Sequence, residues 1–401
     1  MPTSRRSFVA SVAAAPLAHL SLPVSRTIST EIDAERFEPW IEVDAAALRT
    51  NVSVLSQLAG KRPLTAVIKN NGYGLGLVEV ASVLDGVQGV SRFGVVKVDE
   101  ALALREAGIR KPILLLALFD DAEGEALVRH GITLSLATPD AARRVAMATT
   151  RAGRRTTGEF YIDTGMSRMG LPYHRALPVL RELGAQSALT VTGTLTELTE
   201  DAEFDVEQVT RLERLATEAR AAGLTTGPLH AASSHAVFNR RATLLDAVRP
   251  GISVFGAYPT DDGSERSIAQ LTVALRLKAR VVRVEQLRAG DTVSYGRHFT
   301  ATAPTWVATI PMGHADGYPR RAVNGGMIRI RDRSFPVIGA VSASHAIVNL
   351  GAATDVKVGD VATLLGPDDW SIHPNGLASA AGISVYDVLM HLNPKLPRVV
   401  R

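Results

Sequence analysis

The feature that most constrains the fold of this chain is a regular alternation of short apolar runs with helix-like stretches between about residues 40 and 254. Runs such as 64–68, 112–118 and 189–195 have the length of buried parallel strands, and a stretch with helical spacing follows each. The last repeats are a helix at 242–248 and a strand at 252–254. Roughly eight repeats over about 210 residues predict an α/β fold, a parallel sheet closed into a (β/α)8 TIM-type barrel. Chemistry in such barrels lies at the C-terminal strand ends, so residues directly after each strand are the functional candidates.

The pattern changes near residue 271. Alternating β-type runs at 275–284, 306–310 and 335–341 are separated by turns rich in Gly, Asp and Pro. We therefore expect a barrel domain over residues 38–270, followed by a mostly β C-terminal domain over residues 271–401.

The first 30 residues differ in composition from the rest. Arg5 and Arg6 precede Ser7-Phe8 and an apolar run from residue 9 to 22. A charged start, a short apolar centre and small residues before a cleavage site are typical of a signal peptide, and the paired arginines resemble a twin-arginine signal. Residues 1–30 are predicted to direct export to the periplasm; the alternative is an N-terminal tail without defined structure. No later run reaches about 18 uncharged apolar residues, which predicts no membrane contact after signal cleavage.

Composition narrows the class of partner. Lys and Arg number 44 and Asp and Glu 40, so the net charge is only +4, and no basic run typical of nucleic-acid binding is present. Cysteine is absent, which excludes disulfides, thiolate metal ligands and a cysteine nucleophile. We expect a small-molecule partner and no nucleic acid.

Lys69 directly follows the apolar run 64–68, and Gly72, Tyr73, Gly74 and Gly76 come soon after it. At a barrel mouth, desolvation disfavours the ammonium form of a lysine and makes its amine a better nucleophile toward a carbonyl. The glycines allow close approach of backbone to a ligand, although their spacing fits neither a Rossmann nor a phosphate-loop motif. The alternative is a solvated lysine in a tight turn.

Two further strand-end loops carry an arginine. Arg249-Pro250-Gly251-Ile252 falls near the last predicted barrel strand, where barrels often bind phosphate on backbone N–H groups. Arg168 follows Asp163-Thr164-Gly165-Met166, where its guanidinium could hold a carboxylate through two hydrogen bonds. A surface or rim ion pair is the alternative for each arginine.

The C-terminal domain contributes two candidate segments. Tyr295 stands beside Gly296 and Arg297, where a phenol next to a cation could act as an acid or base, although a tyrosine in a turn more often serves in packing. His314 and Asp316 are two residues apart, but no further cluster of metal ligands supports a metal site.

Together these segments resemble the alanine racemase family, pyridoxal-phosphate (PLP) enzymes of fold type III. The resemblance runs from about Trp40 to the C-terminus and depends on five segments in order: Lys69 with Tyr73, 163–166 with Arg168, 249–252, Tyr295-Gly296 and 315–320. It implies a PLP-binding barrel, a C-terminal β domain and a head-to-tail homodimer. The implied activity is racemisation of a small amino-acid substrate, L-alanine to D-alanine by default.

The resemblance also implies roles for single residues. Lys69 would hold PLP and act as one base, and Tyr295 of the partner subunit would be the second. Arg168 would assist near the ring hydroxyl and the substrate carboxylate. Arg249 would face the pyridine nitrogen, and because a guanidinium does not give up its proton it would leave that nitrogen unprotonated and limit side reactions. The residues at the cofactor phosphate would be Tyr73, Ser234, Gly251 and Ile252.

The two-base assignment agrees with the chemistry of racemisation. A proton must leave Cα on one face and return on the other, and a single base would restore the same enantiomer. PLP supplies the electron sink, while the protein orients and tunes it.

Several positions depart from the family pattern. Glu197 stands where the family has a histidine that supports the arginine at the ring nitrogen, and a glutamate there could pair with Arg249 directly. His314 replaces a tyrosine and can still bond a phosphate oxygen. Ala343 and Ser344 replace a methionine and an aspartate of the substrate site, which predicts a wider pocket with one negative charge fewer. We therefore expect side chains larger than methyl to be accepted.

Two other functions fit the same barrel. A PLP-dependent amino-acid decarboxylase of this fold typically uses a cysteine from the partner subunit, and this chain has none. A non-catalytic or otherwise diverged PLP-binding protein would account for the changes at 197, 343 and 344. Such a protein would bind PLP without exchanging the substrate α-hydrogen with solvent.

Overall fold

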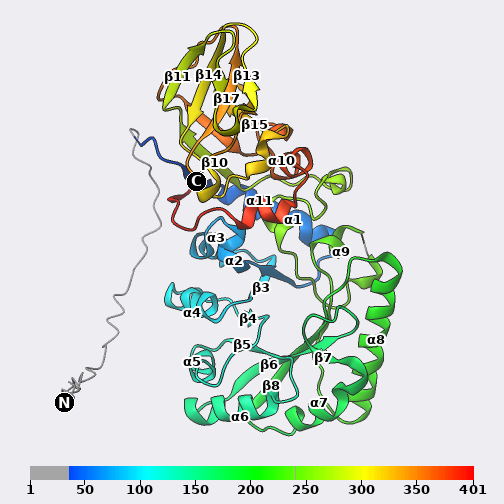
Figure 1. The fold of residues 1–401 in the computed structure, drawn as a ribbon. Coiled ribbons are helices and arrows are strands. Elements are labelled where there is room, and N and C mark those ends of the chain that lie inside the picture. The colour runs from blue at the N-terminus through cyan, green and yellow to red at the C-terminus, as the bar shows by residue number, and fades with distance from the viewer. Residues whose placement is uncertain (1–35, 240) are drawn as a thin grey trace, which may run out of the picture.

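Two sheets organise the computed structural model, which describes residues 36–239 and 241–401. One is a parallel sheet curled into a barrel, and the other is a nine-stranded sheet in a second domain that lies above it in Figure 1. The predicted signal peptide, residues 1–30, lies outside the described residues.

The barrel confirms the predicted fold class. Neighbouring strands pair in parallel, and the last of them is joined back to the first through the segment 246–250. Bridges from His230 to Ala247 and from Leu64 to Val248 close the ring. The strands follow the order β2 (Leu64–Val67), β3 (Val90–Val95), β4 (Ile113–Leu115), β5 (Thr133–Leu136), β6 (Thr156–Asp163), β8 (Leu189–Leu195) and β9 (Leu229–His230), with the short β7 (Leu171–Pro172) beside β6.

Helices surround the barrel on its outer side (Figure 1). Two of these helices start at a capping aspartate: the Asp44 carboxylate accepts the N–H of Ala47, and Asp201 accepts those of Glu203 and Phe204. Their apolar faces pack on the strands, as predicted from the helical spacing. These helices are α1 (Ala45–Leu58), α3 (Leu77–Leu84), α4 (Val98–Glu106), α5 (Gly124–Arg129), α6 (Ala141–Ala152), α7 (Ala176–Gly184), α8 (Ala202–Ala221) and α9 (Ser234–Asn239).

The end of the barrel differs from the sequence prediction. The predicted helix at 242–248 is replaced by the closing segment of the barrel, and the predicted strand at 252–254 is a 3-10 turn, η3 (Ile252–Phe255). A short apolar run is buried in either conformation, so its composition does not distinguish them. The Ser253 N–H instead donates to the Ser234 hydroxyl at 3.3 Å, which holds the chain in the turn.

The second domain is mostly β, as predicted. Its sheet has the order β11-β14-β17-β16-β15-β18-β10-β1-β19, in which β1 spans Trp40–Val43. The small pair β12 (Thr292–Val293) and β13 (Phe299–Thr300) and the helices α10 (Pro374–Ala381) and α11 (Val385–Met390) accompany it. The strands are β10 (Leu275–Arg280), β11 (Arg283–Leu287), β14 (Thr305–Ile310), β15 (Met327–Ile330), β16 (Arg333–Ile338), β17 (Ala346–Gly351), β18 (Val361–Leu365) and β19 (Arg398–Val400).

The strand β1 (Trp40–Val43) belongs to this second sheet and not to the barrel, although the sequence analysis placed residue 38 onward in the barrel domain. It pairs antiparallel with β10 and parallel with β19, and Ile41 and Val43 are fully buried. A four-residue apolar run does not reveal which sheet it joins. The described residues therefore begin in the β domain, continue through the barrel and end in the β domain again.

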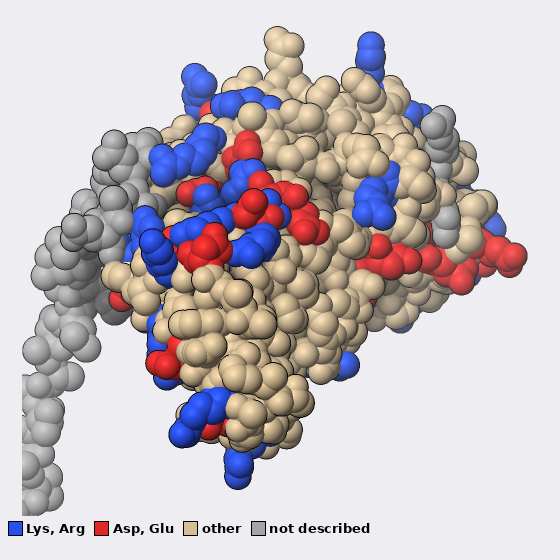
Figure 2. All heavy atoms as spheres, turned by 90° about the horizontal axis from the view of Figure 1, so that it is seen from above, with Lys and Arg blue, Asp and Glu red and all other residues tan. Residues whose placement is uncertain are grey.

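Charged side chains of both signs are mixed over the face seen in Figure 2, with Asp and Glu gathered along one edge. Several charges pair across a helix turn, as Arg214 does with Glu218 at 3.0 Å. None of the helices in residues 36–239 and 241–401 combines the length and apolar character that a bilayer span requires. The same residues hold no group of three or more His, Cys, Asp or Glu placed to share a metal ion.

Candidate active site

A cavity of about 500 Å³ opens at the C-terminal ends of the barrel strands. Loops after β2, β6, β8 and β9 reach it, together with the closing segment and α11. This is the location predicted for chemistry in such a barrel. The cavity brings together eight of the predicted site residues: Lys69, Tyr73, Arg168, Glu197, Ser234, Arg249, Gly251 and Ile252.

The turn that carries Lys69 has an unusual backbone. Residues 70–73 all have positive φ, between 51° and 61°, so that α2 (Lys69–Tyr73) is largely a left-handed turn. For residues other than glycine this conformation costs about 1–2 kcal/mol each. Hydrogen bonds from Asn71 N–H to Glu100 Oε1 (2.9 Å) and from Leu77 N–H to Asn71 Oδ1 (3.1 Å) stabilise it. Strain held by surrounding contacts in this way is typical of functional sites.

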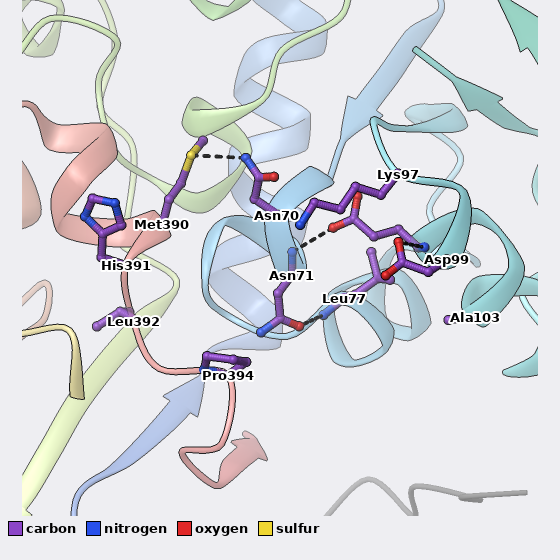
Figure 3. A pocket seen from close by; sticks show the side chains of 11 residues that line it. Asn70, Asn71, Leu77, Lys97, Asp99, Ala103, Met390, His391, Leu392 and Pro394 are labelled. Carbon is purple, nitrogen blue, oxygen red and sulfur yellow. Dashed lines mark hydrogen bonds between the residues drawn. The ribbon is translucent and has the colours of Figure 1, made fainter. Parts of the chain in front are cut away.

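A second cavity of about 680 Å³ lies behind this turn, between α4 and the segment that follows α11 (Figure 3). Figure 3 shows the hydrogen bonds from the Asn70 side-chain amide to the Met390 sulfur and from the Leu77 N–H to the Asn71 side-chain oxygen. Glu100 is almost fully buried here, its Oε2 has no partner among the described residues, and burial raises its pKa. The contacts of Asn70 and Asn71 around this cavity help to hold the turn that carries Lys69.

Burial lowers the pKa of the Lys69 amine. The carboxylate of Glu197 acts in the opposite direction, while the guanidinium of Arg168 lowers the pKa further. A larger neutral fraction of the amine favours attack on a carbonyl, as the sequence analysis expected for a lysine at this place.

Arg249 is held rigidly at the floor of the cavity. It is 4% exposed. Its Nη1 lies 2.7 Å from both Nδ1 and the carbonyl oxygen of His230, and its Nη2 donates to the Thr196 carbonyl (2.7 Å) and to Glu197 Oε2 (3.0 Å). Glu197 thus pairs directly with Arg249, in the way considered for a glutamate at this position.

A chain of buried polar groups continues from Arg249 into the barrel. His230 Nε2 lies 3.0 Å from Glu159 Oε2, and Arg92 pairs with the same carboxylate while its Nε donates to Thr65 at 2.8 Å. Burial alone would raise the pKa of Glu159, but His230 and Arg92 lower it to about 2. Burial lowers the pKa of His230 to about 4, so that Nδ1 is free to accept from Arg249 at neutral pH.

The sequence did not lead us to predict this series of buried polar groups. Arg92 in β3, Glu159 in β6 and His230 in β9 each belong to a strand whose residues are mostly buried. A charged residue inside a strand predicted to be buried was the available signal, because such residues need partners within the barrel.

One end of the cavity is built to receive an anion. The Ser234 hydroxyl oxygen accepts the N–H groups of Gly251 (3.0 Å) and Ser253 (3.3 Å), which leaves its own hydrogen to donate. Tyr73 is 4% exposed and lies against Gly251. A side-chain carbon on Gly251 would overlap the Tyr73 hydroxyl, so only glycine fits there.

The other three predicted residues lie in the β domain and do not line this cavity. Tyr295 is 77% exposed, at the edge of a hollow that Ser342 also lines. The His314 N–H donates to the Ser342 carbonyl and the Ala315 N–H to the Ala343 carbonyl, each at 3.0 Å. The structure therefore gathers Tyr295, His314 and Ala343 in one region of the β domain.

Two residues that sequence reasoning did not select also line the Lys69 cavity. Tyr386 comes from α11, and its ring centroid lies 6.4 Å from that of Tyr73. Glu200 comes from the loop between β8 and α8. Neither residue belongs to a recognisable motif, and only the fold places them here.

Comparison with known proteins agrees with this site. The family profile "Alanine racemase, N-terminal domain" matches residues 43–259, and "Alanine racemase, C-terminal domain" matches residues 274–400. The chain belongs to the alanine racemase family. Similar relatives include the alanine racemases of Carboxydothermus hydrogenoformans, 33% identical over 90% of this chain and 98% of the relative, and of Desulforamulus reducens, 32% identical over the same shares.

Solved alanine racemase structures share the fold over about nine tenths of this chain. The enzyme from D-cycloserine-producing Streptomyces lavendulae superposes with a TM-score of 0.84 at 27% identity, covering 91% of this chain and 97% of that chain. The Bacillus anthracis alanine racemase with bound L-Ala-P gives a TM-score of 0.81 at 26% identity, with 91% and 95% covered.

Alanine racemases depend on PLP, and the cavity fits this cofactor. The Lys69 amine can link to the PLP aldehyde, and the hydroxyl hydrogen of Ser234 is free to donate to its phosphate. Arg249, fixed by five acceptors, can face the ring nitrogen as a cation.

Proposed function

We propose that this protein racemises alanine with PLP and two bases, Lys69 and Tyr295 of the partner subunit. The observation that carries the proposal is the cavity in which a lysine with lowered pKa, a buried serine hydroxyl that is free to donate and a buried arginine occur together. Membership of the alanine racemase family supplies the reaction and the cofactor.

The chain's own residues divide the work. PLP, when bound, supplies the electron sink. Lys69 Nζ takes or returns the Cα proton on its side of the substrate, and Arg168 binds the substrate carboxylate. Because Arg249 keeps its charge and is paired with Glu197, it withholds a proton from the ring nitrogen and limits side reactions.

The second base requires a homodimer. Tyr295 is exposed and stands outside the Lys69 cavity of its own chain, so it can serve only a neighbouring chain. The Ser294 hydroxyl donates to the Ala340 carbonyl at 3.0 Å and holds the turn that presents it. A head-to-tail pair would place each Tyr295 at the cavity of the partner, opposite Lys69.

The substrate range extends beyond alanine in this proposal, because Ala343 and Ser344 are small. A panel of alanine, serine, methionine, lysine and arginine on purified protein tests this range. Strict preference for alanine would rule it out.

Export is part of the same proposal. Residues 1–30, with Arg5 and Arg6, would carry the folded protein to the periplasm by a twin-arginine route. Replacing both arginines by lysine should leave the protein in the cytoplasmic fraction, and unchanged export would contradict this route.

Exchange of the substrate α-hydrogen with deuterium in D2O, started from each enantiomer of alanine, tests the reaction. Lys69→Ala should abolish the visible absorbance of the lysine-bound cofactor. Tyr295→Phe should keep the absorbance but slow exchange of the α-hydrogen by at least 100-fold from one enantiomer. Absorbance without exchange in the wild type would favour a non-catalytic PLP protein, and release of an amine would favour a decarboxylase.

A further inference from the structure

Glu200 occupies a distinctive place at the mouth of the Lys69 cavity. It is exposed in the single chain, on the loop between β8 and α8, and lines the same cavity as Lys69 and Arg168. Its φ is +68°, a conformation that costs free energy for any residue but glycine. Its N–H donates to Asp205 Oδ1 at 3.0 Å, which fixes this backbone. The loop therefore holds a glutamate in a strained position at the entrance of the site.

The Glu200 carboxylate forms no ion pair within the described residues. Arg249 is already paired with Glu197 at 3.0 Å, whereas in the part of the chain that the structure describes no hydrogen bond or ion pair joins the Glu200 carboxylate to another residue. Burial raises its pKa; beyond burial, the charges of Glu197, Asp205 and Glu265 act in the same direction, and only His235 opposes them. Glu200 also raises the pKa of Tyr386, which places the carboxylate near that wall of the cavity.

We propose that Glu200 binds the cationic end of a substrate side chain, so that the protein prefers lysine- or arginine-type amino acids to neutral ones of equal length. The inference deepens the racemase proposed above and depends on it for the reaction. The substrate carboxylate would bind Arg168, and its ammonium or guanidinium would reach the cavity mouth.

The cavity walls suit the aliphatic part of such a side chain. Leu116, Met166 and Met390 line the space together with Glu200, and apolar walls accept the methylene stem of lysine while its charged end remains at the opening. Methionine side chains adapt to different stems. Because the carboxylate is partly open to solvent, its attraction is screened, and we expect a selectivity of about tenfold.

The test uses the PLP-loaded protein and compares L-lysine with L-norleucine, which has a stem of similar length and no charge. Exchange of the α-hydrogen in D2O gives kcat/KM for each. The wild type should favour lysine by about tenfold or more, and Glu200→Gln should bring the ratio close to one. Glu203→Gln is the matched control, since Glu203 is exposed on α8 outside the cavity, and it should retain the wild-type ratio.

Two results would overturn the inference: equal kcat/KM values for lysine and norleucine in the wild type, or a lysine preference that Glu200→Gln leaves intact. Failure of the racemase itself is distinguishable, because then no amino acid exchanges its α-hydrogen. In that case calorimetric binding of L-lysine and L-norleucine decides the role of Glu200. Tighter lysine binding that Glu200→Gln removes would support it, and equal binding would refute it.

Discussion

The buried chain from Arg92 through Glu159 and His230 to Arg249 predicts that Glu159→Gln is strongly destabilising. Glu159 is fully buried between Arg92 and His230. A pKa held at about 2 instead of the ordinary 4.5 corresponds to roughly 3 kcal/mol of preference for the charged carboxylate. Breaking a buried ion pair by neutralising one partner costs about 3–5 kcal/mol, because the other charge is left unpaired. We therefore expect a loss of about 3 kcal/mol or more in the free energy of unfolding.

Thermal unfolding followed by circular dichroism at pH 7 measures this loss. With an unfolding entropy of about 2.1 cal/mol/K per residue, 3 kcal/mol lowers the Tm of a chain of this length by about 4 °C. Glu207→Gln is the control, because Glu207 forms an exposed pair with Arg211 one turn away, worth under about 0.5 kcal/mol. A Tm for Glu159→Gln within one degree of the control would refute the reasoning.

A double replacement sharpens the test. Removing both charges, with Arg92→Met and Glu159→Met, leaves no unpaired ion in the barrel. The double variant should be less destabilised than the sum of the two single variants by at least about 1 kcal/mol. Simple additivity would show that the two side chains do not act as a pair.

Three further predictions follow from the site. Gly251→Ala should weaken PLP binding at least tenfold with the fold retained, since the added methyl meets the Tyr73 hydroxyl at the anion end; a spectrophotometric PLP titration with unchanged affinity would contradict this. The free energy of unfolding should fall by up to about 3 kcal/mol as pH drops from 6.5 to 4, because the unfolded chain protonates His230 near pH 6.5 whereas the folded chain keeps it neutral down to about pH 4. Glu159 adds a further loss between pH 4.5 and 2. Equal urea midpoints at pH 7 and 4.5 would contradict the His230 effect. Glu100→Ala should cost about 1–3 kcal/mol by leaving the Asn71 N–H without its acceptor, whereas Glu100→Gln should cost less because its side-chain oxygen can still accept, and identical urea midpoints for the two variants would exclude this role.

The sequence predicts those site residues whose position along the chain already implies their place in the fold. Lys69 and Arg168 lie in the segments that follow β2 and β6, and barrel strands end at a common mouth. The buried network is different: Arg92 and His230 are 138 positions apart, and only closure of the barrel makes them neighbours. Tyr386 lies in α11, near the C-terminus, and no local sequence pattern predicts that this helix lines the cavity.

The error at residues 252–254 has a local origin. Ile252, Ser253 and Val254 have the composition of a buried strand, and all three are buried. Burial by itself does not choose between a strand and a turn, and here the hydrogen bonds of Ser234 to the backbone decide in favour of the turn.

The pairing of β1 with β19 means that the segments of the described chain translated first and last complete one another. The Arg401 N–H donates to the Val43 carbonyl at 2.8 Å, and Arg398 Nη2 donates to the Gly74 carbonyl at 2.7 Å, beside the turn that carries Lys69. During synthesis the reactive lysine therefore emerges long before the arginine that secures its loop. A fragment cut between the two domains would leave β10 without its β1 neighbour, an open edge of the kind that promotes aggregation. The two domains should consequently resist separate expression, and the lysine loop should acquire its final rigidity only once the whole polypeptide has folded.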